Sequence, residues 1–104
     1  MSEHPHIDAI IHEHNRLRIM AALVALEPGA KVDFSFLRDL LGLTDGNLSA
    51  HLRRLEEAGY VTIEKTFVGR RPKTWICVSE KGRIAFGKYV KALEEIVGRK
   101  FKGE

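Results

Sequence analysis

The sequence predicts a mainly α-helical domain of the α+β class with one small β-hairpin, on three observations. Apolar residues recur at helical spacing in three segments before residue 59 and in one segment after residue 79. Between these segments apolar and polar residues alternate, as in half-buried strands, and a basic stretch containing Gly69 and Pro72 interrupts the alternation. With 104 residues, of which 44% are hydrophobic, the chain has the size of one domain with one core.

We therefore predict a single domain over residues 1–104, with a core of about residues 15–78 and a C-terminal helix of about residues 80–97. The first element is a helix over residues 7–26, with a break near His14 and Asn15. The EPGA segment at residues 27–30 ends this helix, and a brief extended stretch follows.

Two short helices come next. Asp33 is a suitable N-cap for a helix over residues 34–41, and Gly42 ends that helix. Thr44 is the natural N-cap of the second helix, which Gly59 closes in the left-handed conformation. The expected buried stripe of this second helix is Leu48, Leu52 and Leu55.

After Gly59 the spacing of apolar residues changes from that of a helix to the alternation of a strand. Residues 61–67 and 74–78 are the two predicted strands, and VGRRPK at residues 68–73 is the predicted hairpin tip. Ser79 then precedes the last helix, from Glu80 to about Val97.

Two short helices joined by a tight turn at Gly42 form a helix-turn-helix, whose second helix can lie in a major groove of DNA. The basic hairpin that follows has the form of a wing. Residues 1–43 carry four basic and six acidic side chains, residues 44–75 carry six and four, and residues 76–104 carry seven and four. The basic excess behind the net charge of +3 thus lies in the last two thirds of the chain.

The segment LTDGNLSAHLRRLEEAGYV, followed by TIEKTFVGRRPKTWICVSEKGRIAF, resembles the small winged helix-turn-helix transcriptional regulators related to the MarR and ArsR families. The resemblance extends from about Asn15 to Val97. It implies a DNA-binding regulator whose first and last helices join two subunits.

The face of the second short helix opposite its leucines begins with small and polar residues and ends with arginines. Asn47 and Ser49 can hydrogen-bond base edges, Ala50 can touch a thymine methyl group, and the arginines can contact guanine or phosphate. His51 lies nearer the core side. The predicted DNA-reading residues are Thr44, Asp45, Asn47, Ser49, Ala50, His51, Arg53 and Arg54.

The predicted wing contacts are Lys65, Arg70, Arg71 and Lys73, which lie within nine residues that include no acid. A rigid hairpin would carry them to the DNA backbone or into a minor groove. The alternative interpretation is a solvated basic turn that serves solubility. The helix that precedes the wing favours the DNA interpretation.

The last helix has more apolar residues than one face against a small core requires, which is typical of a partner surface. A two-fold homodimer would present two recognition helices about 34 Å apart, matching an inverted repeat. The alternative is that this helix covers the core of a monomer. The predicted interface residues are Ile7, Ile10, Ile11, Phe86, Tyr89, Val90, Leu93, Ile96 and Val97.

Other kinds of site find little support in the sequence. His4, His6, His12 and His14 form two His-x-His pairs, but residues two apart on a helix point away from each other, and no cysteine or acid cluster completes a metal site. No glycine-rich phosphate loop or paired catalytic acids are present, so we predict no enzyme and no cofactor.

The sequence also bears on location and on effectors. Cys77 is the only cysteine and is expected to be a small buried side chain. No apolar run approaches the roughly 18 residues that span a bilayer, and the N-terminus lacks a signal pattern, so we predict a cytoplasmic protein without a membrane partner. The sequence does not identify whether a small-molecule effector is bound.

The predicted function is that of a sequence-specific double-stranded DNA-binding transcriptional regulator, a homodimer on an inverted-repeat operator. Two alternatives are a winged-helix protein-interaction module and a protein that coats DNA nonspecifically. The outer face of the recognition helix distinguishes these functions. A sequence-specific DNA-binding protein needs groups that contact bases, such as Asn47 and Ser49, whereas a protein that coats DNA needs only charge.

Overall fold

The computed structural model describes residues 6–102, with side chains as far as Gly98. The elements follow one another as α1 (His14–Val24), β1 (Val32–Asp33), α2 (Phe34–Leu41), α3 (Asp45–Glu57), β2 (Val61–Val68), β3 (Arg71–Val78) and α4 (Glu80–Lys102). This order confirms the predicted class, a mainly helical domain with a small antiparallel sheet, and it contains the helix-turn-helix (α2 and α3) and the wing (β2 and β3).

The core forms where α1, α2, α3, α4 and the base of the sheet meet. The leucine stripe of α3 is buried as predicted, because residues at helical spacing share one face of the helix. The buried residues around that stripe are Ile11, Ile19, Met20, Leu23, Leu37, Val61, Ile76, Val78 and Tyr89.

The predicted helix over residues 7–26 is wrong at its N-terminal end, because α1 begins only at His14. Asp8 Oδ1 instead accepts hydrogen bonds from the N–H groups of Ile10 and Ile11, which closes a turn. Glu13 then acts as the N-cap of α1, accepting from Asn15 N and Arg16 N at 3.0 and 2.8 Å. The predicted break near His14 and Asn15 thus coincides with the start of α1, and the segment before it is a turn capped by Asp8 and not a helix.

The caps of the two short helices match the sequence in most respects. Thr44 Oγ1 accepts from Asn47 N at 3.1 Å, and Gly42 and Gly59 have φ of 68° and 81°. Asp33 is the N-cap residue of α2, but its side chain makes no capping hydrogen bond.

The sheet has the order β1-β3-β2, and β1 joins it through Val32 opposite Ile76. The predicted tip at residues 68–73 is too long, since only Gly69 and Arg70 lie between paired Val68 and Arg71. Gly69 has φ of 66°, which suits the first position of a two-residue hairpin turn.

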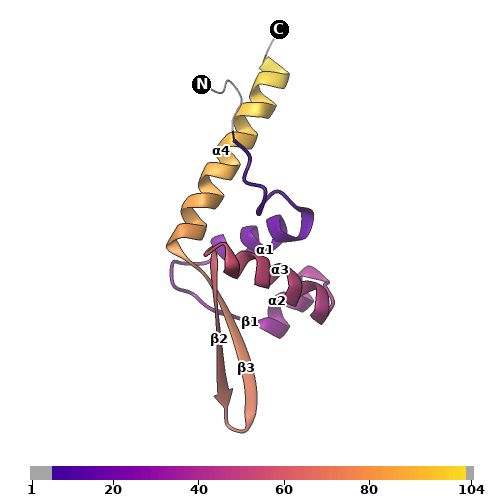
Figure 1. The fold of residues 1–104 in the computed structure, drawn as a ribbon, viewed down its shortest axis with the longest axis vertical. Coiled ribbons are helices and arrows are strands. Elements are labelled where there is room, and N and C mark those ends of the chain that lie inside the picture. Colours follow the sequence, from indigo (N-terminus) through magenta and orange to yellow (C-terminus); the bar gives the residue numbers. More distant parts are fainter. Residues whose placement is uncertain (1–5, 103–104) are drawn as a thin grey trace.

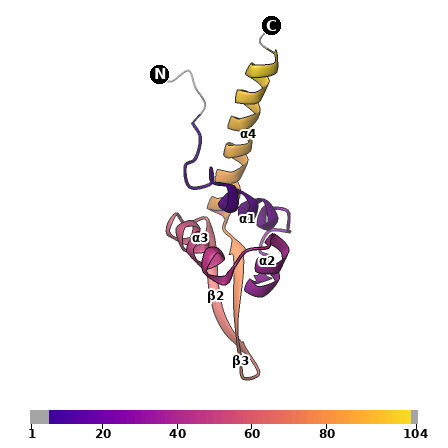
Figure 2. The same ribbon diagram turned by 90° about the vertical axis from the view of Figure 1, so that its right-hand side faces the viewer.

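The hairpin and α4 leave the helical body in opposite directions, so the molecule measures 61 × 25 × 22 Å (Figures 1 and 2). At the start of α4, Ser79 Oγ accepts from Gly82 N at 2.9 Å and donates to Gly59 O at 2.6 Å. The predicted end of this helix near residue 97 is too early, because α4 continues to Lys102. Its outer turns therefore extend beyond the core.

Candidate nucleic-acid interface

The outer face of α3 is exposed along its whole length. Its first turn presents Asp45, Asn47 and Ser49 to solvent, and Ala50 follows them. Arg53 and Arg54 are exposed one turn further on. This exposed surface therefore contains the small and polar side chains at the helix start and the two arginines, as the helical spacing predicts.

His51 lies apart from that face. It is half-buried, with its Nδ1 atom 3.3 Å from Arg16 Nη1 and 3.6 Å from Glu13 Oε1. Burial opposes ionisation of Glu13, but the N–H groups of Arg16 and Asn15, together with the His51 and Arg16 side chains, outweigh burial and lower the pKa of Glu13. His51 thus connects α3 to the start of α1.

Asp45 is engaged by a residue that the sequence did not single out. Arg38 on α2 donates from Nη1 to Asp45 Oδ1 at 2.8 Å and from Nε to Asp39 Oδ1 at 2.9 Å. These two carboxylates raise the pKa of Arg38. The Arg38–Asp45 pair connects α2 to the first turn of α3 on the exposed surface.

An open cleft of about 760 Å³ separates α3 from the wing. Ser49 and Arg53 line it from α3, whereas Lys65 and Thr74 line it from the two wing strands. The structure thus brings together predicted residues from both parts of the sequence. Phe34, Glu56 and Thr74 also line this cleft, although the sequence did not single them out.

Arg71 and Lys73 lie outside that cleft. They border a smaller hollow of about 350 Å³ near the start of α2, which Ser35 also lines. Arg70 occupies the exposed hairpin turn. The four wing cations therefore surround the hairpin and do not form a single row.

Trp75 contacts residues on both wing strands near the base of the wing. Trp75 Nε1 donates to Thr66 Oγ1 at 3.0 Å across the strand pair, and Lys73 Nζ lies 5.6 Å from the centroid of the indole ring. Opposite Trp75 on β1 is Asp33, so a third strand supports the hairpin at this point. Trp75 thus connects the two wing strands near the base of the wing.

The charge of the surface comes from the wing more than from α3. Helix α3 contains two arginines and three acids, Asp45, Glu56 and Glu57. The acid in β2, Glu64, pairs with Lys31 at 2.6 Å. Positive charge at this surface is therefore concentrated at the wing, whereas α3 offers mainly hydrogen-bonding groups.

A family model described as a winged helix DNA-binding domain matches residues 15–97. The chain belongs to the winged helix DNA-binding domain family. An uncharacterized protein of Methanocaldococcus jannaschii is 44% identical to it over 75 residues, covering 72% of this chain and 78% of the relative.

Two solved structures extend this relationship to transcriptional regulators. A transcriptional regulator homologue from Pyrococcus horikoshii OT3 is 31% identical with a TM-score of 0.76, covering 85% of this chain and 84% of that chain. The crystal structure of MarR is 25% identical with a TM-score of 0.62, covering 90% and 71%. The protein is thus a DNA-binding winged helix transcriptional regulator of the MarR type, and the family and its neighbours are regulators, not enzymes.

The residues of the predicted subunit interface of this winged helix regulator fall into three groups by burial. Ile11 and Tyr89 are fully buried within the protomer, and His12 Nδ1 lies 2.8 Å from the Tyr89 hydroxyl. Ile96 and Val97 are 39% and 50% exposed. The other predicted members, which are partly buried against the core, are Ile7, Ile10, Phe86, Val90 and Leu93.

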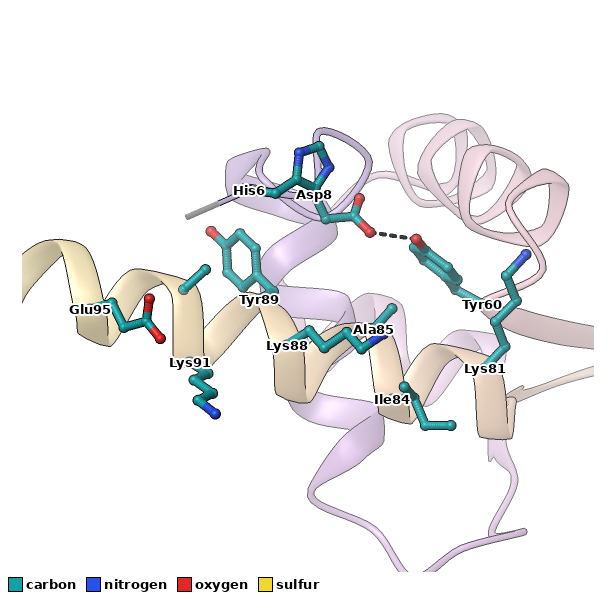
Figure 3. A pocket seen from close by; sticks show the side chains of 11 residues that line it. His6, Asp8, Tyr60, Lys81, Ile84, Ala85, Lys88, Tyr89, Lys91 and Glu95 are labelled. Carbon is teal, nitrogen blue, oxygen red and sulfur yellow. Dashed lines mark hydrogen bonds between the residues drawn. The ribbon is translucent and has the colours of Figure 1, made fainter. Parts of the chain in front are cut away.

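A separate pocket of about 560 Å³, away from the wing, lies between the N-terminal turn and the inner half of α4 (Figure 3). Asp8 accepts a hydrogen bond from the Tyr60 hydroxyl at its edge. Burial, together with this bond to Asp8, raises the pKa of Tyr60 to about 12. The sequence did not predict this pocket, because its lining comes from three segments far apart in the chain.

Among residues 6–102, no group of three or more histidine, cysteine or acidic side chains could hold a metal ion. His4, one of the four histidines considered above, lies outside the described residues. Cys77 is half-buried, less than expected for a core side chain, and has a free thiol. In the same part of the chain, no helix is long and apolar enough to cross a membrane.

Proposed function

We propose that this winged helix regulator binds double-stranded DNA sequence-specifically, as a homodimer on an inverted-repeat operator. Helix α3 would enter the major groove, where Asn47 and Ser49 hydrogen-bond base edges. The wing would follow the adjacent backbone and minor groove. The protein would act in the cytoplasm, without a catalytic step.

The observation that carries the proposal is the cleft between α3 and the wing. Ser49 and Arg53 face it from the helix, and Lys65 faces it from the wing, so base-directed and phosphate-directed groups border one open space. DNA binding by charge alone would need cations throughout, but α3 has more acids than arginines. A surface without net positive charge on the groove-facing helix, and with its cations in the wing, favours sequence-specific recognition over nonspecific coating.

The homodimer rests on α4. A helix of 23 residues is about 35 Å long, and Ile96 and Val97 are exposed where it extends past the core. Pairing of these outer turns with a second copy would bury them. A two-fold axis through such a contact would relate two α3 helices, as an inverted repeat requires.

Selection of bound sequences from random duplex DNA at near-physiological salt tests the proposal. We expect an enriched palindrome whose half-site centres lie one helical turn, about 34–36 Å, or a multiple of it apart. An enriched single half-site would contradict the homodimer. Absence of any enrichment despite binding would support nonspecific coating, and absence of binding would support a protein-interaction module.

A further inference from the structure

The wing of this regulator ends in an apolar tip. Phe67 is 73% exposed, more than any other large apolar side chain with described burial, and its neighbour Val68 is 58% exposed. A side chain of this size on solvent-facing surface loses the free energy that its burial would provide. Nothing within the protomer covers Phe67 among the described residues, so a stable hairpin does not explain it.

The strand register assigns Phe67 to one face of the hairpin. Successive residues of a strand point to opposite faces, and Phe67 pairs with Pro72, as Lys65 pairs with Thr74 and Ile63 with Ile76. Lys65, Thr74 and Ile63 all line the cleft facing α3. Phe67 therefore continues the face of the wing that borders the cleft, and Val68 belongs to the other face.

The reach of the wing can be estimated from the same register. Phe67 is four residues beyond Ile63, and a strand advances about 3.3 Å per residue, so the Cα atom of Phe67 lies about 13 Å along the strand from the core pair of Ile63 and Ile76. This distance exceeds the depth of a B-DNA minor groove, about 7.5 Å. The tip is therefore long enough to reach the floor of a groove while the body of the protein stays outside.

The charges around the tip favour a polyanion as its partner. Arg70 lies in the hairpin turn beyond Phe67, Arg71 belongs to the pair next to that of Phe67, and Lys65 and Lys73 lie within two pairs of it. Residues 65–73 include no acid, and the preceding Glu64 is paired with Lys31. An apolar protein partner would gain nothing from four surrounding cations, whereas DNA would neutralise them.

We propose that Phe67 enters the minor groove beside each half-site as an apolar wedge that partly unstacks one base step. Minor-groove proteins insert such side chains between base pairs, where the cost of unstacking is offset by contacts that the bent DNA makes. Pyrimidine–purine steps unstack most easily, so Phe67 would add a preference for such a step at a position that α3 does not touch. This inference rests on the proposed DNA binding and assigns the wing a part in specificity.

The test uses the full-length protein and a duplex that carries the selected operator, with 2-aminopurine placed in turn at the steps flanking each half-site. We expect wild-type protein to raise 2-aminopurine fluorescence at one flanking step in each half-site. Phe67→Ala should abolish this rise and weaken binding about tenfold, with an unchanged salt slope, because no phosphate contact is lost. Phe67→Leu should retain part of the rise.

Val68→Ala is the matched control, since it shortens an exposed apolar side chain at the same tip but on the opposite face. It should leave the fluorescence rise intact. Both positions are exposed, so thermal unfolding should be unchanged in either variant.

Failure of the wedge can be distinguished from failure of DNA binding. No enriched operator in the selection would overturn both. Specific binding without a fluorescence rise in wild-type protein, or with the same rise in Phe67→Ala, would overturn the wedge alone. Loss of binding to anionic lipid vesicles in Phe67→Ala, with unchanged binding and fluorescence on the operator, would assign Phe67 to a membrane surface and would also overturn it.

Discussion

Substitution of Asn47 most directly tests whether the protein recognises a DNA sequence or binds DNA by charge alone. Its backbone N–H donates to Thr44 Oγ1, and its side chain is exposed on the first turn of α3. Asn47→Ala keeps that backbone donor, so the start of the helix should form as before. We expect the substitution to cost about 1–3 kcal/mol of binding free energy on the selected operator and much less on a shuffled duplex.

Fluorescence anisotropy with both duplexes measures this difference. Glu57→Gln serves as the control, because Glu57 is exposed at the far end of the same helix and its charge should affect both duplexes equally. Equal losses on the two duplexes in Asn47→Ala would contradict direct readout.

Gly82 permits the close approach of α4 to the backbone of Tyr60, between α3 and β2. A Cβ atom at this position would lie 2.2 Å from the Tyr60 carbonyl oxygen and 3.0 Å from Val78 Cγ2. The same Tyr60 oxygen accepts from Ser79 N at 2.9 Å, so it is held in place. Gly82→Ala should therefore lower the free energy of unfolding by about 1–3 kcal/mol.

Gly87→Ala is the matched control for that prediction, because it adds the same methyl group to the same helix where no heavy atom lies within 4 Å. It should stabilise the protein by about 0.5–1 kcal/mol through helix propensity. Urea unfolding at one protein concentration compares the two variants. Equal stability of the two variants would show that the contact with Tyr60 relaxes freely.

At the scale of elements, local signals predicted most of the helix-turn-helix and less of its surroundings. The cap Thr44, the buried leucines and Gly59 all lie within or beside α3. The bounds and the buried face of this helix could therefore be predicted from its local sequence. The start of α1 is different, because Asp8 and Glu13 interrupt a sequence whose apolar spacing fits a continuous helix. The Arg38–Asp45 pair and the pocket beside α4 join distant segments, which periodicity does not reveal.

Pro72, which the sequence predicts in the hairpin tip, lies in strand β3. Pro72 is one pair beyond the turn-closing pair of Val68 and Arg71, where the backbone nitrogen of an antiparallel strand points away from its partner. Strand β1 pairs only with Trp75 and Ile76 and does not reach Pro72. Its missing N–H therefore leaves no hydrogen bond unmade, and the strand continues to the turn.

Arg71 tests the role of the wing in phosphate binding. If Arg71 meets one phosphate, Arg71→Ala should reduce the slope of log K against log salt concentration by about 0.9 and weaken binding equally on selected and shuffled duplexes. Arg71→Lys should retain the slope, because it keeps the charge. An unchanged slope in Arg71→Ala would exclude a phosphate contact by this residue.

The junction of α1 and α3 should be sensitive to acid. The pKa of Glu13 is lowered in the folded protein from its ordinary value of 4.5, so ionised Glu13 stabilises the fold at pH above that value. This contribution should disappear as the pH falls below 4.5 and through the lowered pKa. Unfolding midpoints in urea between pH 7 and pH 3 should fall more steeply for wild-type protein than for Glu13→Gln. Parallel curves would contradict a special role for this carboxylate.

For the whole molecule, the proposed dimer is expected to depend on the outer turns of α4. Val97→Glu places a charge in the exposed apolar end of the helix and should convert the proposed dimer to a monomer in sedimentation equilibrium. Phe67→Ala removes a more exposed apolar group from the hairpin, which extends from the end of the molecule opposite α4 (Figure 1), and should leave the mass unchanged. A monomeric mass for wild-type protein, or an unaltered dimer in Val97→Glu, would contradict a dimer through this part of α4.

The division of charge between the wing and α3 predicts how the two contributions combine on DNA. In the proposed complex, the wing cations would supply affinity that salt weakens for every sequence, and the first turn of α3 would supply the difference in affinity between sequences. The most direct test is the ratio of the dissociation constants of wild-type protein for the selected operator and for a shuffled duplex of equal composition, at near-physiological salt. We expect the operator to bind at least about 1,000-fold more tightly. A ratio near one would contradict sequence-specific reading by this protein.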